Sequence, residues 1–184
     1  MFTFWHYKLV NKHRLKGVKS VIIASNHISW YDPPFIGSVL PFEITFLAKA
    51  ELCKKKIFAK MFNWMNVIPI FRGRPDKGAI EKSIKVLNEN KSLLIFPQGT
   101  RNGKNIKPGI GLFSINTQHD ILPVYIENAD KLFHCLFFLK RLKIVIGEII
   151  PFSKFSDLEP NKENYQIISD YTFKKIEELR DENN

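Results

Sequence analysis

Short runs of apolar residues alternate along the chain with longer segments in which apolar residues recur every three or four positions. The short runs predict β-strands. They are Val21–Ser25, Ile44–Ala48, Val67–Phe71, Leu93–Phe96, Leu122–Ile126 and Leu142–Gly147. The longer segments predict helices and are Leu52–Met65, Lys77–Asn88, Ile110–Thr117 and Asn161–Arg180. Strands that alternate with helices are typical of an α/β layer structure.

The segment Lys77–Asn88 shows this helical pattern most clearly. Ile80, Ile84 and Leu87 share one face, and Asp76 directly before the segment is a start signal for a helix. No internal repeat, low-complexity tract or linker divides the chain. The sequence therefore predicts a single α/β domain with a mixed, mostly parallel central sheet flanked by helices.

Residues 1–19 differ in character from the rest of the chain. They mix aromatic and aliphatic residues with cations, among them Phe4, Trp5, Lys8, Arg14 and Lys16. Aromatic rings favour the headgroup level of a bilayer and cations favour anionic lipid, so one interpretation is an anchor that lies on a membrane. The other is a helix that covers the edge of the sheet, with its cations merely solvated. We divide the chain into a membrane-association segment, 1–19, and the α/β domain, 20–184.

Composition narrows the class of partner. The chain has 184 residues, 45% of them apolar, which is the makeup of one globular domain. Lys and Arg total 28 against 18 Asp and Glu, and the net charge of +10 indicates an anionic partner. The cations are spread along the chain and no nucleic-acid-binding motif is present. With aromatic residues at 13%, we expect an acidic membrane surface rather than nucleic acid.

We expect a cytoplasmic protein that associates peripherally with the membrane. The most apolar stretch, Leu132–Leu139, ends at Lys140 and falls short of the ~18 residues that read as a spanning helix. Aromatic and basic residues at 5–8 interrupt any secretory signal. Cys53 and Cys135 stand alone, without the close pairing of a zinc site, and fit a reducing compartment.

A histidine and an aspartate five positions apart, His27 and Asp32, directly follow the first predicted strand. The C-terminal end of a strand is where α/β folds place ligands. The carboxylate can accept a hydrogen bond from one imidazole nitrogen and leave the other as a base. If the substrate supplies its own hydroxyl, no serine or cysteine nucleophile is required. The alternative is that Asp32 only caps a helix and His27 is an ordinary loop histidine.

Three further strand ends carry a basic residue. Gly99 permits close approach of the backbone to an oxyanion, and Arg101 offers a fork of donors that matches phosphate. Lys49 and Arg72 follow two other predicted strands. Each alone fits an ordinary strand-exit turn or a solvated side chain. Together, at one sheet edge beside His27, they predict a site for an anionic substrate.

Four ordered segments of the chain resemble the glycerolipid acyltransferases. The segments are Asn26–Asp32, which has the His-x4-Asp motif of that family, Val67–Arg72, Phe96–Arg101 and Ile121–Val124. The likeness extends over about Lys19 to Phe152 and is strongest to bacterial 1-acyl-sn-glycerol-3-phosphate acyltransferases. It implies the glycerol-phosphate acyltransferase fold and a role in phospholipid biosynthesis at the inner face of the bacterial cell membrane.

The resemblance implies a reaction and a set of residues. The reaction is transfer of a fatty acyl chain from acyl-CoA or acyl-carrier protein to the hydroxyl of lysophosphatidic acid, which gives phosphatidic acid. His27 is implied as general base and Asp32 as the group that orients it. The implied substrate-binding residues are Lys49, Arg72, Gln98, Gly99, Thr100 and Arg101. Neither a metal ion nor a cofactor is expected, since this chemistry needs neither.

Gln98 departs from the family pattern, in which glutamate is usual at this position. Glutamine keeps the shape and can accept a hydrogen bond, but it lacks the charge. Two alternatives to the expected reaction therefore stay open. The same chemistry could act on another acceptor, such as glycerol-3-phosphate or another lysophospholipid, or the chain could be a lipid-binding module that has lost catalysis.

Overall fold

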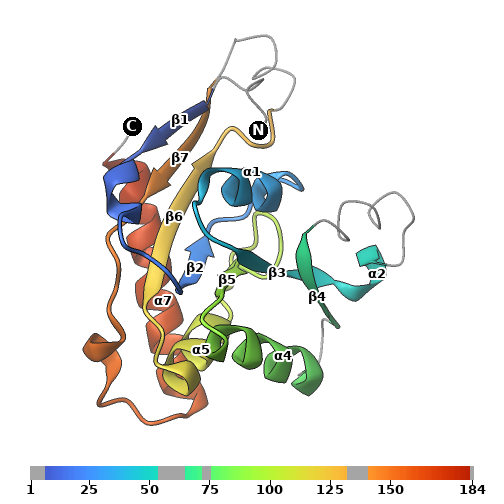
Figure 1. Cartoon of the computed structure of the whole chain (residues 1–184), viewed down its shortest axis with the longest axis vertical. Helices are drawn as coiled ribbons and strands as arrows, with labels where there is room; N and C mark the ends of the chain where they lie inside the picture. The colour runs from blue at the N-terminus through green and yellow to red at the C-terminus, as the bar shows by residue number, and fades with distance from the viewer. Residues whose placement is uncertain (1–6, 54–64, 72–75, 132–140, 183–184) are drawn as a thin grey trace.

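The computed structural model describes residues 7–53, 65–71, 76–131 and 141–182 (Figure 1). Its strands are β1 (Tyr7–Val10), β2 (Ile22–Ser25), β3 (Ile44–Lys49), β4 (Asn66–Ile70), β5 (Ser92–Ile95), β6 (Ile121–Glu127) and β7 (Leu142–Ile146). Its α-helices are α1 (Asp32–Val39), α2 (Ala50–Cys53), α4 (Lys77–Asn88), α5 (Gly109–Thr117) and α7 (Lys162–Asp181). Two 3₁₀ turns, η1 (Lys12–Leu15) and η2 (Phe152–Phe155), complete the described elements.

All seven strands form one sheet in the order β1-β7-β6-β2-β5-β3-β4. Every neighbouring pair is parallel except β6 and β7, which confirms the mixed, mostly parallel sheet. The register places Ile22 of β2 opposite Leu93 of β5 on one side and opposite Ile121 of β6 on the other. The C-terminal ends of β2, β3, β4, β5 and β6 therefore meet at a single edge.

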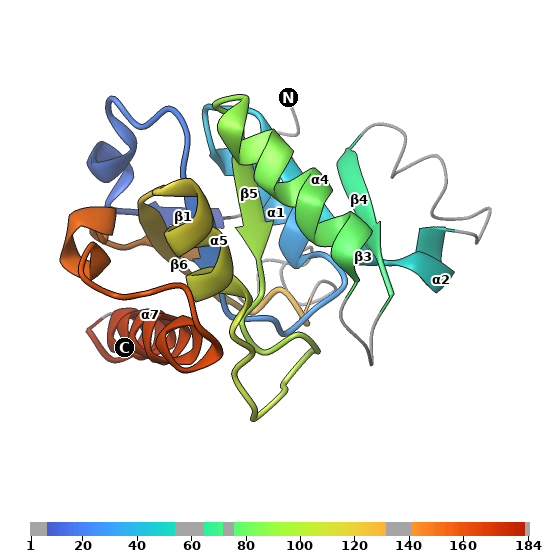
Figure 2. The ribbon, with the colours of Figure 1, turned by 90° about the horizontal axis from the view of Figure 1, so that it is seen from below.

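Each face of the sheet buries its own apolar cluster, because successive side chains of a strand point to opposite faces. Ile23 belongs to the cluster that packs against α1, which includes Ile36. Its neighbour Ile22 belongs to the cluster beneath α4, α5 and α7, which includes Ile110 and Ile168. Figure 2 shows these three helices one after another across that face. Helices thus flank both faces, as expected.

The predicted helices and strands agree closely with the structure. The six predicted strands correspond to β2 through β7 with ends that differ by at most one residue. The helix over Lys77–Asn88 is α4, and Asp76 caps it by accepting a hydrogen bond from the Ala79 N–H at 3.1 Å. The predicted helices Ile110–Thr117 and Asn161–Arg180 correspond to α5 and α7. Most of Leu52–Met65 lies outside the described residues.

The beginning of the chain is a strand, so the interpretation of a helix at the sheet edge is wrong for Tyr7–Val10. This strand, β1, pairs in parallel with β7, and the unpaired backbone groups at that edge explain why an extended chain is favoured there. Arg14 donates hydrogen bonds to the Ile146 carbonyl at 3.0 Å and to Glu148 at 3.1 Å. Residues 7–10 are therefore part of the sheet, and Arg14 holds the following 3₁₀ turn, η1, against the end of β7.

Among the residues that the structure describes, none of the helices combines the length and the apolar character that a bilayer span requires.

Candidate active site

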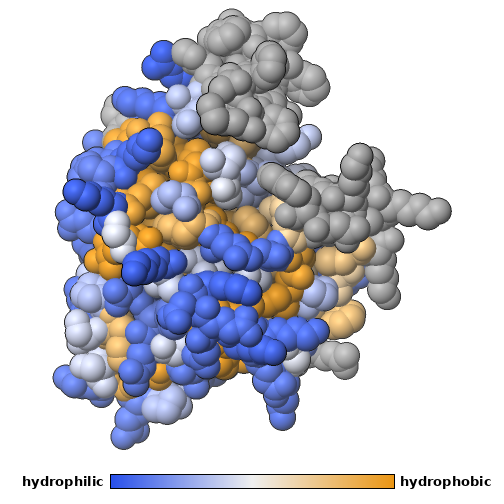
Figure 3. Space-filling model, in the orientation of Figure 1, coloured by the Kyte–Doolittle hydropathy of each residue, from blue (hydrophilic) through white to orange (hydrophobic). Residues whose placement is uncertain are grey.

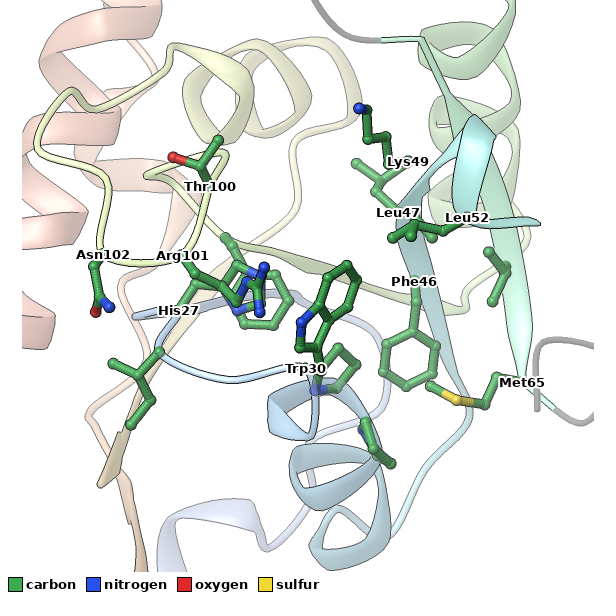
Figure 4. Close-up of a pocket in the computed structure, with 16 residues that line it drawn as sticks. His27, Trp30, Phe46, Leu47, Lys49, Leu52, Met65, Thr100, Arg101 and Asn102 are labelled. Atoms are coloured by element: carbon green, nitrogen blue, oxygen red, sulfur yellow. The ribbon is translucent and has the colours of Figure 1, made fainter. Parts of the chain in front are cut away.

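Three strand ends supply the residues of the site. The loop after β2 carries His27 and Trp30, the turn after β5 carries Thr100 and Arg101, and β3 ends at Lys49. Because β2, β5 and β3 are parallel neighbours, these ends lie together at one edge of the sheet. Figure 4 shows their side chains around a common pocket.

His27 and Asp32 form the pair that their spacing predicted. The imidazole Nδ1 lies 2.7 Å from Asp32 Oδ2, and the Asp32 side chain is fully buried. The same carboxylate oxygen accepts the backbone N–H groups of Ile28 at 2.7 Å and Ser29 at 2.8 Å. With three donors fixed on Oδ2, Nδ1 holds the proton of the neutral ring and Nε2 keeps a basic lone pair.

Further contacts fix the backbone and the ring of His27. The ring stacks on Phe96, with centroids 4.1 Å apart and planes inclined by 20°. The His27 N–H donates to Gln98 Oε1 at 2.9 Å, and the His27 carbonyl accepts the Asn102 N–H at 2.8 Å. The imidazole is thus presented to the pocket in one orientation.

Both the oxygen and the nitrogen of the Gln98 side-chain amide form hydrogen bonds. Besides accepting from His27, it donates from Nε2 to the Gly103 carbonyl at 2.9 Å. It joins the loop after β2 to the turn after β5, and its side chain is not among those that line the pocket. A carboxylate at this position could accept from His27 but has no hydrogen to donate to Gly103.

Gly99 adopts a left-handed conformation, with φ of 67°, which explains a glycine in this turn. Its N–H donates to the Phe96 carbonyl at 2.9 Å and is therefore used within the turn. The residue lines a second cavity of about 480 Å³ between α4 and α5. That cavity is mostly apolar and shares Leu47, Phe96 and Thr100 with the pocket of His27.

The pocket of His27 has a volume of about 690 Å³ and two chemically different halves. In Figure 4, His27, Thr100, Arg101 and Asn102 lie on one side of Trp30. The apolar side chains Phe46, Leu47, Leu52 and Met65 lie on the other side. Hydrophobic surface also lies between hydrophilic patches on the face shown in Figure 3. Such a pocket suits an amphipathic ligand with a polar group near His27.

The predicted cations are brought to this pocket in part. Arg101 lines it, with its guanidinium carbon 4.0 Å from the centre of the Trp30 ring. Lys49 lines it as well and lies 3.6 Å from the carboxylate of Glu51. Arg72 follows Phe71 at the end of β4 and lies outside the described residues.

The described part of the chain offers a base at the pocket but no activated cysteine. Cys53 ends α2 and does not line the pocket, and burial raises the pKa of its thiol. A thiol with a raised pKa is protonated at neutral pH and is a weak nucleophile. The arrangement can therefore activate a hydroxyl supplied by a ligand.

Trp30 and Asn102 are two polar-side residues of the pocket to which the sequence assigned no role. Trp30 lies within the His27–Asp32 segment, but a tryptophan there has no spacing signal of its own. Asn102 has φ of 53° and contributes its backbone N–H to His27. Both depend on contacts between β2 and β5 loops that are distant in sequence.

The known proteins to which this chain is similar in sequence are acyltransferases. The sequence model of the acyltransferase family matches residues 6–127. The 1-acyl-sn-glycerol-3-phosphate acyltransferase of Bacillus subtilis is 28% identical over 175 residues, which cover 94% of this chain and 87% of that protein. The protein of that name from Borreliella burgdorferi is 33% identical over 171 residues, covering 88% and 68%.

A solved structure shares the fold. The crystal structure of the 1-acyl-sn-glycerophosphate (LPA) acyltransferase PlsC from Thermotoga maritima superimposes with a TM-score of 0.65. The superposition covers 95% of this chain and 73% of that one, at 20% sequence identity.

Proposed function

This chain belongs to the acyltransferase family, and from that we propose that it acylates the free hydroxyl of lysophosphatidic acid to give phosphatidic acid. The observation that carries the proposal is the His27–Asp32 pair at 2.7 Å beside a pocket with one cationic and one apolar half. The acyl donor in this proposal is a thioester, acyl-CoA or acyl-carrier protein, and no metal ion or cofactor takes part.

In the proposed reaction His27 is the general base. Its Nε2 removes the proton from the acceptor hydroxyl as that oxygen attacks the thioester carbonyl carbon. The tetrahedral intermediate collapses with cleavage of the C–S bond, and the thiol leaves with the proton that the imidazolium returns. Asp32 stabilises the imidazolium between these two steps. A positioned base of this kind accelerates a reaction by about 10² to 10⁴.

Each half of the pocket is proposed to bind a different part of the acceptor. The Arg101 guanidinium is placed to bind the phosphate, with Thr100 on the same side of Trp30 (Figure 4). The Lys49 ammonium is proposed to help from across the pocket, where it lies near Leu47 and Leu52. Arg72 is proposed for the same role from its position in the sequence. The apolar half accommodates the acyl chain.

The direct test is a thiol-release assay with each thioester donor. Release of the thiol is expected with lysophosphatidic acid and not with monoacylglycerol, which has the same hydroxyl and acyl chain but no phosphate. Mass spectrometry should then find phosphatidic acid. Release with glycerol-3-phosphate alone would assign the same chemistry to another acceptor. Absence of release with every acceptor would contradict the proposed enzyme and favour a lipid-binding module.

We also propose that the protein docks on the inner face of the cell membrane through the edge of the sheet that carries the pocket. Phe71, at the end of β4, is 48% exposed and Tyr7, at the start of β1, is 49% exposed. Because β1 runs opposite to β2, both lie at that edge. Aromatic side chains and the net charge of +10 favour an anionic bilayer surface.

Flotation with vesicles tests this docking. The protein is expected to float with vesicles of anionic phospholipid at low salt, and the bound fraction should fall as salt screens the attraction. Vesicles of zwitterionic lipid serve as the control. Equal flotation with both kinds of vesicle would contradict an electrostatic contribution, and no flotation at low salt would contradict the docking itself.

A further inference from the structure

Trp30 and Arg101 make a contact that the reaction outlined above does not use. The guanidinium carbon of Arg101 lies 4.0 Å from the centre of the Trp30 ring, which is the geometry of a cation–π stack. Trp30 belongs to the loop that carries His27, and Arg101 belongs to the turn after β5. Figure 4 shows the indole in the middle of the pocket, with Arg101 and His27 on the same side.

This stack orients an exposed cation without consuming its donors. An arginine side chain loses much rotamer freedom when it is fixed, so an unsupported guanidinium at the surface samples many positions. Stacking uses the flat face of the guanidinium and leaves its N–H groups around the rim. Within the described residues no carboxylate pairs with Arg101. The N–H rim is therefore available to a ligand.

We propose that Trp30 is a positioning residue for the acceptor: its indole holds the Arg101 guanidinium with the N–H rim free to bind a phosphate monoester. The inference rests on the proposed function and extends it, because it names the residue that makes Arg101 selective for a phosphate-bearing acceptor. A phosphate monoester is the matching ligand, since its oxygens can accept two parallel N–H bonds from one guanidinium.

Kinetics distinguish this role from a structural one. The stack positions Arg101, and the contact of Arg101 with the phosphate is the same in the ground state and in the transition state. Loss of the stack should therefore raise KM and leave kcat nearly unchanged. Trp30→Ala is expected to raise the KM for lysophosphatidic acid by about two- to thirtyfold, the range of a cation–π contact from exposed to desolvated sites. The KM for the acyl donor should stay the same. Trp30→Phe, which keeps an aromatic face, should recover part of the loss.

Tyr31 provides a matched control. It is the next residue, is 47% exposed against 44% for Trp30, and does not line the pocket. Tyr31→Ala therefore removes a comparable exposed aromatic ring and should leave the KM for lysophosphatidic acid unchanged. An equal rise in KM for both variants would overturn the inference, because it would indicate loss of aromatic surface rather than loss of the stack.

A double-mutant cycle isolates the stack itself. Once Arg101→Ala has removed the cation, Trp30→Ala should have little further effect on the KM for lysophosphatidic acid. Fully additive effects of the two substitutions would mean that Trp30 and Arg101 act independently, and the proposal would then be wrong.

Titration with glycerol-3-phosphate gives a readout that does not depend on turnover. This ligand carries the phosphate without an acyl chain, and its binding to Arg101 should change the fluorescence of Trp30. The saturable change is expected in the unaltered protein and should be lost in Trp30→Phe and in Arg101→Ala, with glycerol as the ligand control. A change without turnover would refute the proposed function and leave the inference standing. Turnover with no such change, and with an unaltered KM in Trp30→Ala, would refute the inference alone.

Discussion

Replacement of His27 by alanine is expected to lower turnover by about 10²- to 10⁴-fold, the contribution of a positioned general base. The fold should survive, because Asp32 keeps the N–H groups of Ile28 and Ser29 as partners. Thiol release in the presence of lysophosphatidic acid measures the loss, and circular dichroism checks the fold.

His119 is the matched control for this substitution. It is a half-buried histidine whose Nδ1 contacts the Thr117 carbonyl at 2.8 Å, and it does not line the pocket. His119→Ala should leave turnover close to that of the unaltered protein. Undiminished turnover in His27→Ala would exclude His27 as the base, whatever the family relationship.

Asp32→Asn is expected to lower both turnover and stability. The amide cannot stabilise the imidazolium, so kcat should fall by about 10²- to 10⁴-fold. Asp32 Oδ1 is buried and has no hydrogen-bond partner among the described residues. An asparagine that keeps its oxygen at Oδ2 puts its NH₂ group at that site, which should cost about 1–3 kcal/mol of unfolding free energy. Kinetics and urea unfolding measure the two effects.

Asp120→Asn separates the catalytic effect from the structural one. Asp120 also accepts a backbone N–H, that of Phe152 at 2.8 Å, but it lies just before β6 at the opposite edge of the sheet. Its replacement should reduce stability without altering kcat. Asp32→Asn with unchanged kcat and reduced stability would mean that Asp32 serves only the fold.

The sequence predicted the central strands well for a physical reason. Strands buried on both faces, such as β2 and β5, are continuous apolar runs and stand out from their surroundings. The edge strand β1 has no such run, because Tyr7 and Lys8 are exposed and only Leu9 and Val10 are partly buried. What makes it a strand is the open edge of β7, which the local sequence does not reveal.

The same distinction between local and distant contacts applies to the site. His27 and Asp32 are five positions apart within one loop, so their pairing could be predicted from spacing. The partners of the loop after β2 lie in the turn after β5, and the register that pairs Ile22 with Leu93 brings the two together. Trp30 could not be assigned a role before that register was known.

Gln98 shows how the structure can change the meaning of a residue. Its lack of charge suggested altered acceptor binding or lost catalysis. In the fold its amide accepts from His27 and donates to Gly103, and only a group with both a donor and an acceptor can do this. The glutamine thereby ties His27 to the turn that presents Arg101.

The same sequence separation relates the register of β2 and β5 to the contact between His27 and Gln98. Residues paired between β2 and β5 are separated by the same 71 positions as His27 and Gln98. A slip of β5 by a single residue would move each of its buried side chains to the opposite face of the sheet, into the wrong apolar cluster, and would separate both the Gln98 and the Arg101 contacts in the same movement. A misregistered chain would thus be unstable and inactive together, so assembly of the hydrophobic core and assembly of a competent site are a single all-or-none event.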